Sequence, residues 1–119
     1  MAREITILSL NPDGKKLLGQ ESALRENGFE IISVPTPLQA RFEIEMGRCG
    51  VFLTSYITPI VIYQDLASLF RRSCPSGLVI YIAQRRDDNI PDADILLSDQ
   101  DEPHSLIEKL RSKLGAKAS

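Results

Sequence analysis

Small polar side chains follow the apolar segments of this sequence, and they are the groups from which a site would be built. They are Ser9, Asn11, Thr54, Ser55, Ser98 and Asp99. Most carry neutral hydroxyl or amide groups, which suit hydrogen bonding to a ligand. A serine hydroxyl is a poor nucleophile unless a base activates it. The one histidine, His104, stands at the start of a predicted helix, where we expect it to be solvated. The sequence therefore predicts no enzyme.

The composition limits the classes of function further. The chain has 119 residues, of which 43% are hydrophobic and 25% charged, and this is typical of one globular domain spanning 1–119. The net charge of −2 argues against direct binding to nucleic acid. No apolar run approaches the roughly 20 residues that cross a bilayer. One histidine and two cysteines, Cys49 and Cys74, are too few for a histidine- or cysteine-rich metal site. We therefore expect a cytoplasmic protein with free thiols, no membrane segment, no metal and no cofactor.

Short apolar runs alternate with amphipathic stretches along the whole chain. The runs that predict strands are Ile5–Leu10, Phe29–Val34, Cys49–Thr54, Gly77–Ala83 and Ala93–Ser98. The stretches that predict helices are Lys15–Asn27, Pro37 to about Gly47, Ile60–Arg72 and a last helix from about Pro103 to Gly115. The nine residues Gln84–Asp92 are polar and too few for a full helix.

Hydrophobic spacing predicts which face of each helix is buried. In the first helix, Leu17, Leu18 and Leu24 are expected inward, and Lys16 and Glu21 are expected in water. In the second helix, Leu38 and Phe42 are expected inward, together with either Ile44 or Met46.

Strands that alternate with helices favour parallel pairing through right-handed crossovers. We therefore predict an α/β fold: a flavodoxin-like, doubly wound sheet of five parallel strands in the order 2-1-3-4-5, with the helix between strands 4 and 5 shortened or absent. Such sheets bind ligands beyond the carboxyl ends of strands 1 and 3. The residues expected there are Ser9, Leu10, Asn11, Asp13, Thr54, Ser55, Tyr56, Ala83, Gln84, Ser98 and Asp99.

Three segments make the chain similar to a known family. They are Ile7–Pro12, Val51–Pro59 and Ala93–Ser98, and in spacing and hydrophobicity they resemble the CheY-like receiver domain of two-component response regulators. The resemblance implies a phospho-acceptor aspartate four residues before a proline, and the residue four before Pro59 is Ser55. The resemblance also implies an acidic pair at Ser9 and Leu10, switch residues at Ile82 and Leu96, and a lysine at Asp99.

None of these positions holds the residue type that the resemblance implies. Mg²⁺ takes hard oxygen ligands, usually including carboxylates, which Ser9 and Leu10 do not offer. The carboxylate of Asp99 would repel a phosphoryl group that a lysine would hold. The chain therefore resembles a degenerate pseudo-receiver without the acceptor aspartate. We expect a phosphorylation-independent signalling module of a two-component-type system, which binds a signalling or output protein or a second copy of itself. The alternative is a small-molecule-binding domain that uses the crevice at the carboxyl ends of strands 1 and 3.

Overall fold

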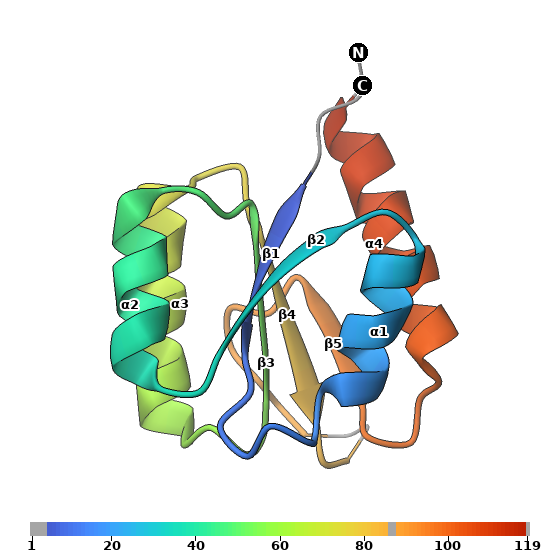
Figure 1. Cartoon of the computed structure of the whole chain (residues 1–119), viewed down its shortest axis with the longest axis horizontal. Helices are drawn as coiled ribbons and strands as arrows, with labels where there is room; N and C mark the ends of the chain where they lie inside the picture. The colour runs from blue at the N-terminus through green and yellow to red at the C-terminus, as the bar shows by residue number, and fades with distance from the viewer. Residues whose placement is uncertain (1–4, 86–87, 119) are drawn as a thin grey trace.

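The structure is a computed structural model that describes residues 5–85 and 88–118, and this part of the chain holds five strands and four helices (Figure 1). In chain order they are β1 (Thr6–Leu10), α1 (Leu18–Glu26), β2 (Glu30–Val34), α2 (Pro37–Met46), β3 (Val51–Ser55), α3 (Ile60–Ser73), β4 (Leu78–Ala83), β5 (Ile95–Ser98) and α4 (Pro103–Ala118).

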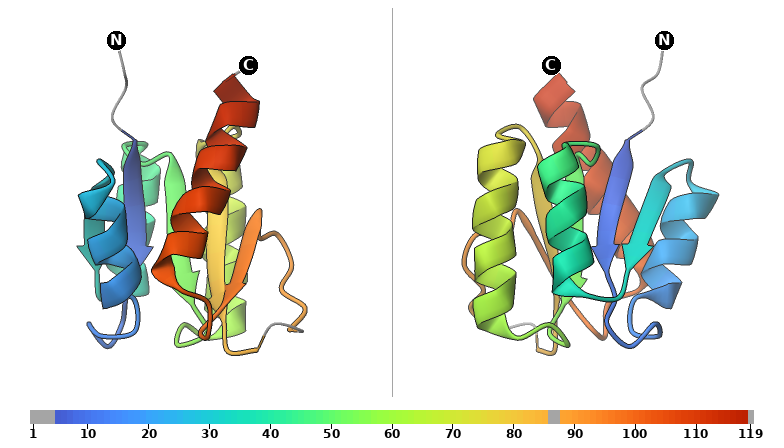
Figure 2. Two further views of the ribbon diagram at one scale, coloured as in Figure 1. Left: turned by 90° about the vertical axis from the view of Figure 1, so that its right-hand side faces the viewer. Right: turned by 60° about the vertical axis from the view of Figure 1, so that its left-hand side comes forward.

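All neighbouring strands are parallel, and their order is β2-β1-β3-β4-β5. The predicted sheet is therefore confirmed. Two further views show α1 and α4 on one face of the sheet and α2 and α3 on the other (Figure 2). The central strands β3 and β4 are buried along their whole length, as their apolar runs predict for strands covered on both faces.

Two hydrophobic clusters hold the helices against the sheet. Under α2 and α3 the core includes Leu10, Ile44, Phe52, Tyr63 and Phe70. Under α1 and α4 it includes Leu24, Leu53, Ile82, Leu106 and Leu110. The sheet is thus the middle of three layers, and its carboxyl edge is the place where the loops from both faces meet.

The connection between β4 and β5 contains no helix among its described residues, in agreement with its short length. Arg86 and Asp87 lie outside the described residues. Side chains of α3 hold the remainder of the connection. The Tyr63 hydroxyl donates to the Pro91 carbonyl oxygen at 2.7 Å, and Arg71 donates to the Asp92 carbonyl at 2.6 Å and pairs with the Asp94 carboxylate at 2.8 Å. Hydrogen bonds from one helix therefore order a segment that has few apolar anchors of its own.

Three predicted inward positions are wrong. Leu18, Leu38 and Phe42 are exposed, with 51%, 77% and 55% of their surface accessible. In α2 the buried residues are Ala40 and Ile44, and Phe42 lies two residues from each, which places it on the opposite side of the helix. In α1 the helix begins at Leu18. Leu17 therefore reaches the core from the preceding turn, and Leu18 is rotated away from Leu24.

Candidate functional site

The strands end together at the carboxyl edge of the sheet, which brings four loops to one place. Ser55 at the end of β3 pairs with Ile82, and Ala83 at the end of β4 pairs with Ser98 at the end of β5. Tyr56 and Asp99 follow directly: the Tyr56 N–H donates to the Ile82 carbonyl oxygen at 3.0 Å, and the Asp99 N–H donates to the Ala83 carbonyl at 2.8 Å. The residues that could form a site at this edge therefore have fixed backbones.

Ser55 occupies the position that the resemblance assigns to the acceptor aspartate, and it is completely buried at 0% exposure. Its Oγ accepts a hydrogen bond of 3.3 Å from the Ile57 N–H. The neighbouring Thr54 is also buried; its hydroxyl donates to the Leu10 carbonyl at 3.2 Å and lies 2.9 Å from the Thr58 hydroxyl. These hydroxyl groups are engaged inside the protein and do not face solvent.

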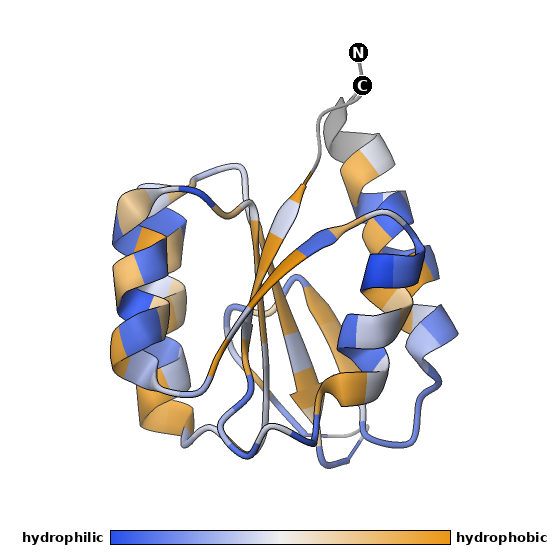
Figure 3. Cartoon of the chain, viewed as in Figure 1, coloured by the Kyte–Doolittle hydropathy of each residue, from blue (hydrophilic) through white to orange (hydrophobic). Residues whose placement is uncertain are grey.

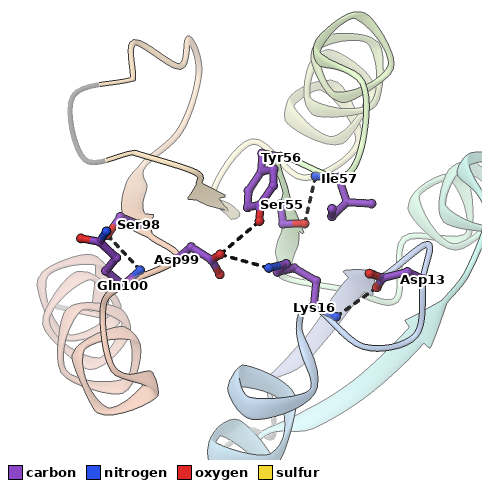
Figure 4. A network of polar contacts seen from close by, with 8 residues as sticks. All are labelled: Asp13, Lys16, Ser55, Tyr56, Ile57, Ser98, Asp99 and Gln100. Atoms are coloured by element: carbon purple, nitrogen blue, oxygen red, sulfur yellow. Dashed lines mark hydrogen bonds and ion pairs between the residues drawn. The ribbon is translucent and has the colours of Figure 1, made fainter.

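An ion pair crosses the loops outside Ser55 (Figure 4). Lys16, from the loop before α1, places its Nζ 3.0 Å from the Asp99 carboxylate in the loop after β5. The Tyr56 hydroxyl donates to the same carboxylate oxygen at 3.1 Å, and Nζ of Lys16 lies 5.1 Å from the centre of the Tyr56 ring. Contacts to Tyr56 and then to Asp99 raise the pKa of Lys16 above its ordinary value. Three loops are therefore tied together by one carboxylate.

The loop that carries Lys16 is shaped by its own sequence. The Asp13 carboxylate accepts hydrogen bonds of 2.9 and 3.0 Å from the N–H groups of Lys15 and Lys16, which also lower the pKa of Asp13. Gly14 adopts a left-handed φ of 68°, a conformation that side chains disfavour. Asp13 therefore accepts hydrogen bonds from the backbone of its own turn and does not cap α1, whose N-cap residue is Leu17.

The other positions that the resemblance singles out face into the packed layers. Leu10 and Leu96 pack in the cluster under α2 and α3, and Ile82 packs in the cluster under α1 and α4. Ser9 lies one residue before the end of β1, opposite Ser33 and Leu53. Of the six positions, Leu10 and Ser55 are the last residues of β1 and β3, and Asp99 directly follows the end of β5.

Ser9 belongs to a buried polar cluster that the sequence did not predict. Its hydroxyl donates to the Glu21 carboxylate at 2.6 Å, and the Ser33 hydroxyl donates to the same oxygen at 2.8 Å. Glu21 was expected in water, yet its exposed fraction is 2%. The available signal was a pair of serines inside two apolar strands, because buried hydroxyl groups require a partner.

The donor set at this edge does not fit Mg²⁺. The Ser9 hydroxyl is taken by Glu21, Leu10 has no donor atom, and Asp99 is paired with Lys16. Hard divalent cations require carboxylate or carbonyl oxygens that are free to turn toward them. Among residues 5–85 and 88–118, no group of three or more histidine, cysteine or acidic side chains has an arrangement that could hold a metal.

Within the part of the chain that the structure describes, Asn11 carries a buried side-chain atom without a hydrogen-bond partner. It is the first residue after β1, is 3% exposed, and its N–H donates to the Val34 carbonyl at 2.9 Å. Its side-chain Oδ1 is buried and accepts no hydrogen bond from the described residues. A buried amide oxygen in this state is unfavourable unless a small polar molecule reaches it.

Comparisons with known proteins agree with this architecture. No family model and no curated protein sequence matches the chain. Within the part that the structure describes, no helix combines the length and hydrophobicity that crossing a bilayer requires. Solved structures do match, and over nearly the whole chain.

A response regulator from Thermotoga maritima superposes with a TM-score of 0.80 at 14% identity, covering 95% of this chain and 99% of that one. A CheY-like receiver domain protein from Methanospirillum hungatei JF-1 gives 0.82 at 18% identity and covers 98% of both chains. A receiver protein from Sinorhizobium medicae WSM419 gives 0.76 at 22% identity, covering 97% of this chain and 98% of that one. The chain therefore has the fold of CheY-like response regulator receiver domains.

Proposed function

We propose that the chain is a receiver-like signalling module of a two-component-type system that works without phosphorylation, binds another protein and catalyses no reaction. The observation that carries the proposal is the Lys16–Asp99 ion pair, which spans the loops outside the buried Ser55. The resemblance to receivers implies acidic side chains after strand 1 and a lysine after strand 5. Here the lysine comes from the first loop and the carboxylate from the last, so the charges are interchanged.

Interchanged charges remove what phosphoryl transfer requires. Transfer to a side chain depends on a nucleophile and on cations that neutralise the phosphoryl oxygens. Ser55 offers a buried hydroxyl without a base, and Lys16 is already bound to Asp99. With the site closed by its own side chains, the fold remains as a rigid scaffold, and its outer surfaces are left to act by binding. The free Cys49 and Cys74 thiols suit a reducing compartment, and we place the module in the cytoplasm.

Incubation with Mg²⁺ and acetyl phosphate tests the proposal directly. We expect no covalent adduct of about 80 Da, the mass of one added phosphoryl group, in the intact mass spectrum, while a phosphorylatable receiver treated alongside acquires one. Titration with Mg²⁺ and beryllofluoride, which mimics a phosphoryl group, is expected to leave the amide NMR spectrum unchanged. A phosphorylated aspartate, or saturable shifts that spread from Ser55 to α4, would refute the proposal.

A small-molecule site at the same edge is the second candidate, and the unpartnered Oδ1 of Asn11 is the observation in its favour. The other neutral groups that such a site would use are already bonded: Ser9 to Glu21, Thr54 to the Leu10 carbonyl, and Ser98 to Asp101. Absorbance and native mass of the purified protein distinguish the two candidates. A stoichiometric bound molecule that is lost in an Asn11→Ala variant would favour the ligand-binding function.

A further inference from the structure

The outer face of α2 carries an exposed hydrophobic stripe. Leu38, Phe42 and Met46 lie four residues apart, so they follow one another along one side of the helix. Their exposed fractions are 77%, 55% and 53%. Figure 3 shows hydrophobic segments recurring along α2, which lies at the outside of the molecule. Monomeric proteins rarely expose large contiguous apolar patches, and the patches that do occur often mark binding surfaces.

The stripe is not produced by a loosely packed helix. The opposite side of α2 is anchored in the core by Ala40 and Ile44, both buried. The Thr36 hydroxyl caps the first turn by accepting from the Gln39 N–H at 3.2 Å, and Gly47, with a φ of 70°, ends the helix. The helix is therefore held in one rotation, and the three hydrophobic side chains point away from the sheet.

Charges border the stripe in a self-complementary arrangement. Arg41 and Glu45, both half-exposed, lie on one flank with 3.8 Å between their charged atoms. On the other flank, Glu43 pairs with Arg48 at 2.6 Å. The surface thus carries two cations and two anions and has no net charge of its own.

We propose that this face binds the same face of a second copy of the chain, with the two α2 helices antiparallel about a two-fold axis at the level of Glu43, midway between Arg41 and Glu45. The proposal deepens the protein-binding function above by naming the partner. Two-fold symmetry then places Phe42 beside its counterpart, one residue from the axis on either side, and Leu38 beside Met46 of the other copy, so the apolar groups are covered by one another. The same symmetry brings like flanks together, which places Arg41 of each copy beside Glu45 of the other.

Charge complementarity favours a second copy over an unrelated partner. A strongly basic or acidic partner finds no opposite net charge here, whereas the Arg41 and Glu45 pair matches its own image. Like charges face each other nowhere on that flank. Electrostatic matching of this kind gives specificity more than affinity. The stripe is only three side chains long, so we expect a weak, reversible dimer of the class that buries less than about 1,200 Å².

Sedimentation velocity over a concentration series of about 10 μM to 1 mM, the range where weak interfaces associate, tests the inference. The wild-type chain is expected to shift from monomer to dimer. Phe42→Glu places two carboxylates beside each other close to the symmetry axis and should weaken dimerisation at least tenfold, an order of magnitude typical of a central interface residue. Leu18→Glu is the matched control, since Leu18 is similarly exposed, on α1, and should leave the dimer unchanged.

Charge reversal supplies a second test, which distinguishes a specific loss of dimerisation from a general loss of folding. Arg41→Glu and Glu45→Arg each bring like charges together and should each weaken the dimer. The double variant restores opposite charges across the two-fold axis and should recover dimerisation.

A wild-type chain that stays monomeric throughout, including one that binds only a different protein through α2, would overturn the inference. So would a dimer that survives Phe42→Glu or dissociates with Leu18→Glu. Neither result bears on phosphorylation, which the acetyl phosphate experiment measures separately.

Discussion

Lys16 and Asp99 lie 83 residues apart in the sequence, yet their side chains meet at 3.0 Å across the carboxyl edge of the sheet. The contact joins the loop that follows β1 to the loop that follows β5. Because Tyr56 donates to the same carboxylate, the loop after β3 is included. One acidic side chain thus connects three loops. The resemblance to receivers assigns the residues of phosphorylation to the ends of the strands that precede these loops.

Replacing Ser55 by aspartate tests whether the edge retains any capacity for an acceptor carboxylate. Ser55 is fully buried, and the nearby ammonium of Lys16 is held by Asp99. We expect Ser55→Asp to lower the free energy of unfolding by about 3 kcal/mol or more, because an unpaired charge is placed in the interior. Urea denaturation at pH 7 measures this loss. Lowering the pH toward 4 should reduce it, since protonation removes the buried charge.

Ser55→Ala is the matched control and is expected to cost no more than about 1 kcal/mol, the value of one modest hydrogen bond. A Ser55→Asp variant that is as stable as the wild type and takes up beryllofluoride would show that the site is still competent.

The ion pair itself is expected to stabilise the loops weakly and in a salt-dependent way. A double-mutant cycle of Lys16→Met and Asp99→Asn should give a small favourable coupling that shrinks as sodium chloride is added, because both side chains are partly exposed. The pKa of Lys16 is raised, so its contribution is complete below the ordinary lysine pKa and is lost only as the pH rises through the raised value. The coupling should therefore not change between pH 6 and 9. Lys15→Met is the control for loss of a neighbouring lysine, and an equal effect there would contradict a specific pair.

The architecture was predictable because it depends on patterns that a sequence displays. Continuous apolar runs such as Val51–Leu53 and Leu78–Ala83 specify strands buried on both faces, and the nine residues Gln84–Asp92 are too few for a full helix with its connecting loops. Helix rotation was less predictable. In α2 the small Ala40 and the single Ile44 face the core, whereas the larger Phe42 does not. Hydrophobicity alone therefore selected Leu38 and Phe42 wrongly, although Ile44, one of the two alternatives expected inward, is buried.

The polar contacts of the candidate site were not predictable for a different reason. Lys16 and Glu21 are ordinary charged residues of an amphipathic helix, and nothing local distinguishes them from solvated ones. Their partners, Asp99 for the first and Ser9 and Ser33 for the second, lie in other elements. Only the strand order brings these groups together, so sequence reasoning could place Ser9 and Asp99 at the edge without finding what they bind.

The buried Glu21 is expected to be a larger source of stability than its type suggests. Glu21→Ala leaves the hydroxyl groups of Ser9 and Ser33 without their acceptor and should lower the free energy of unfolding by about 2–4 kcal/mol. Glu21→Gln keeps an acceptor oxygen and should cost less. Glu26→Ala, on an exposed part of the same helix, is the control and should change stability by no more than about 0.5 kcal/mol. Equal losses at Glu21 and Glu26 would show that the buried cluster contributes nothing.

Cys49 gives the chain a pH dependence on the alkaline side. Burial first, and the nearby Glu43 carboxylate second, raise the pKa of this thiol from about 9 to about 11. The unfolded chain therefore loses the proton above pH 9, whereas the folded chain retains it up to about pH 11. The stability that this difference contributes is complete below pH 9 and is lost as the pH rises toward 11.

Cys49→Val removes the titrating group while keeping a buried apolar side chain. Urea denaturation at pH 7.5, 9, 10 and 11 should then show a smaller decline in unfolding free energy for the variant than for the wild type. Identical declines would mean that the tyrosines, whose pKa values are also raised at Tyr63 and Tyr81, account for the whole effect.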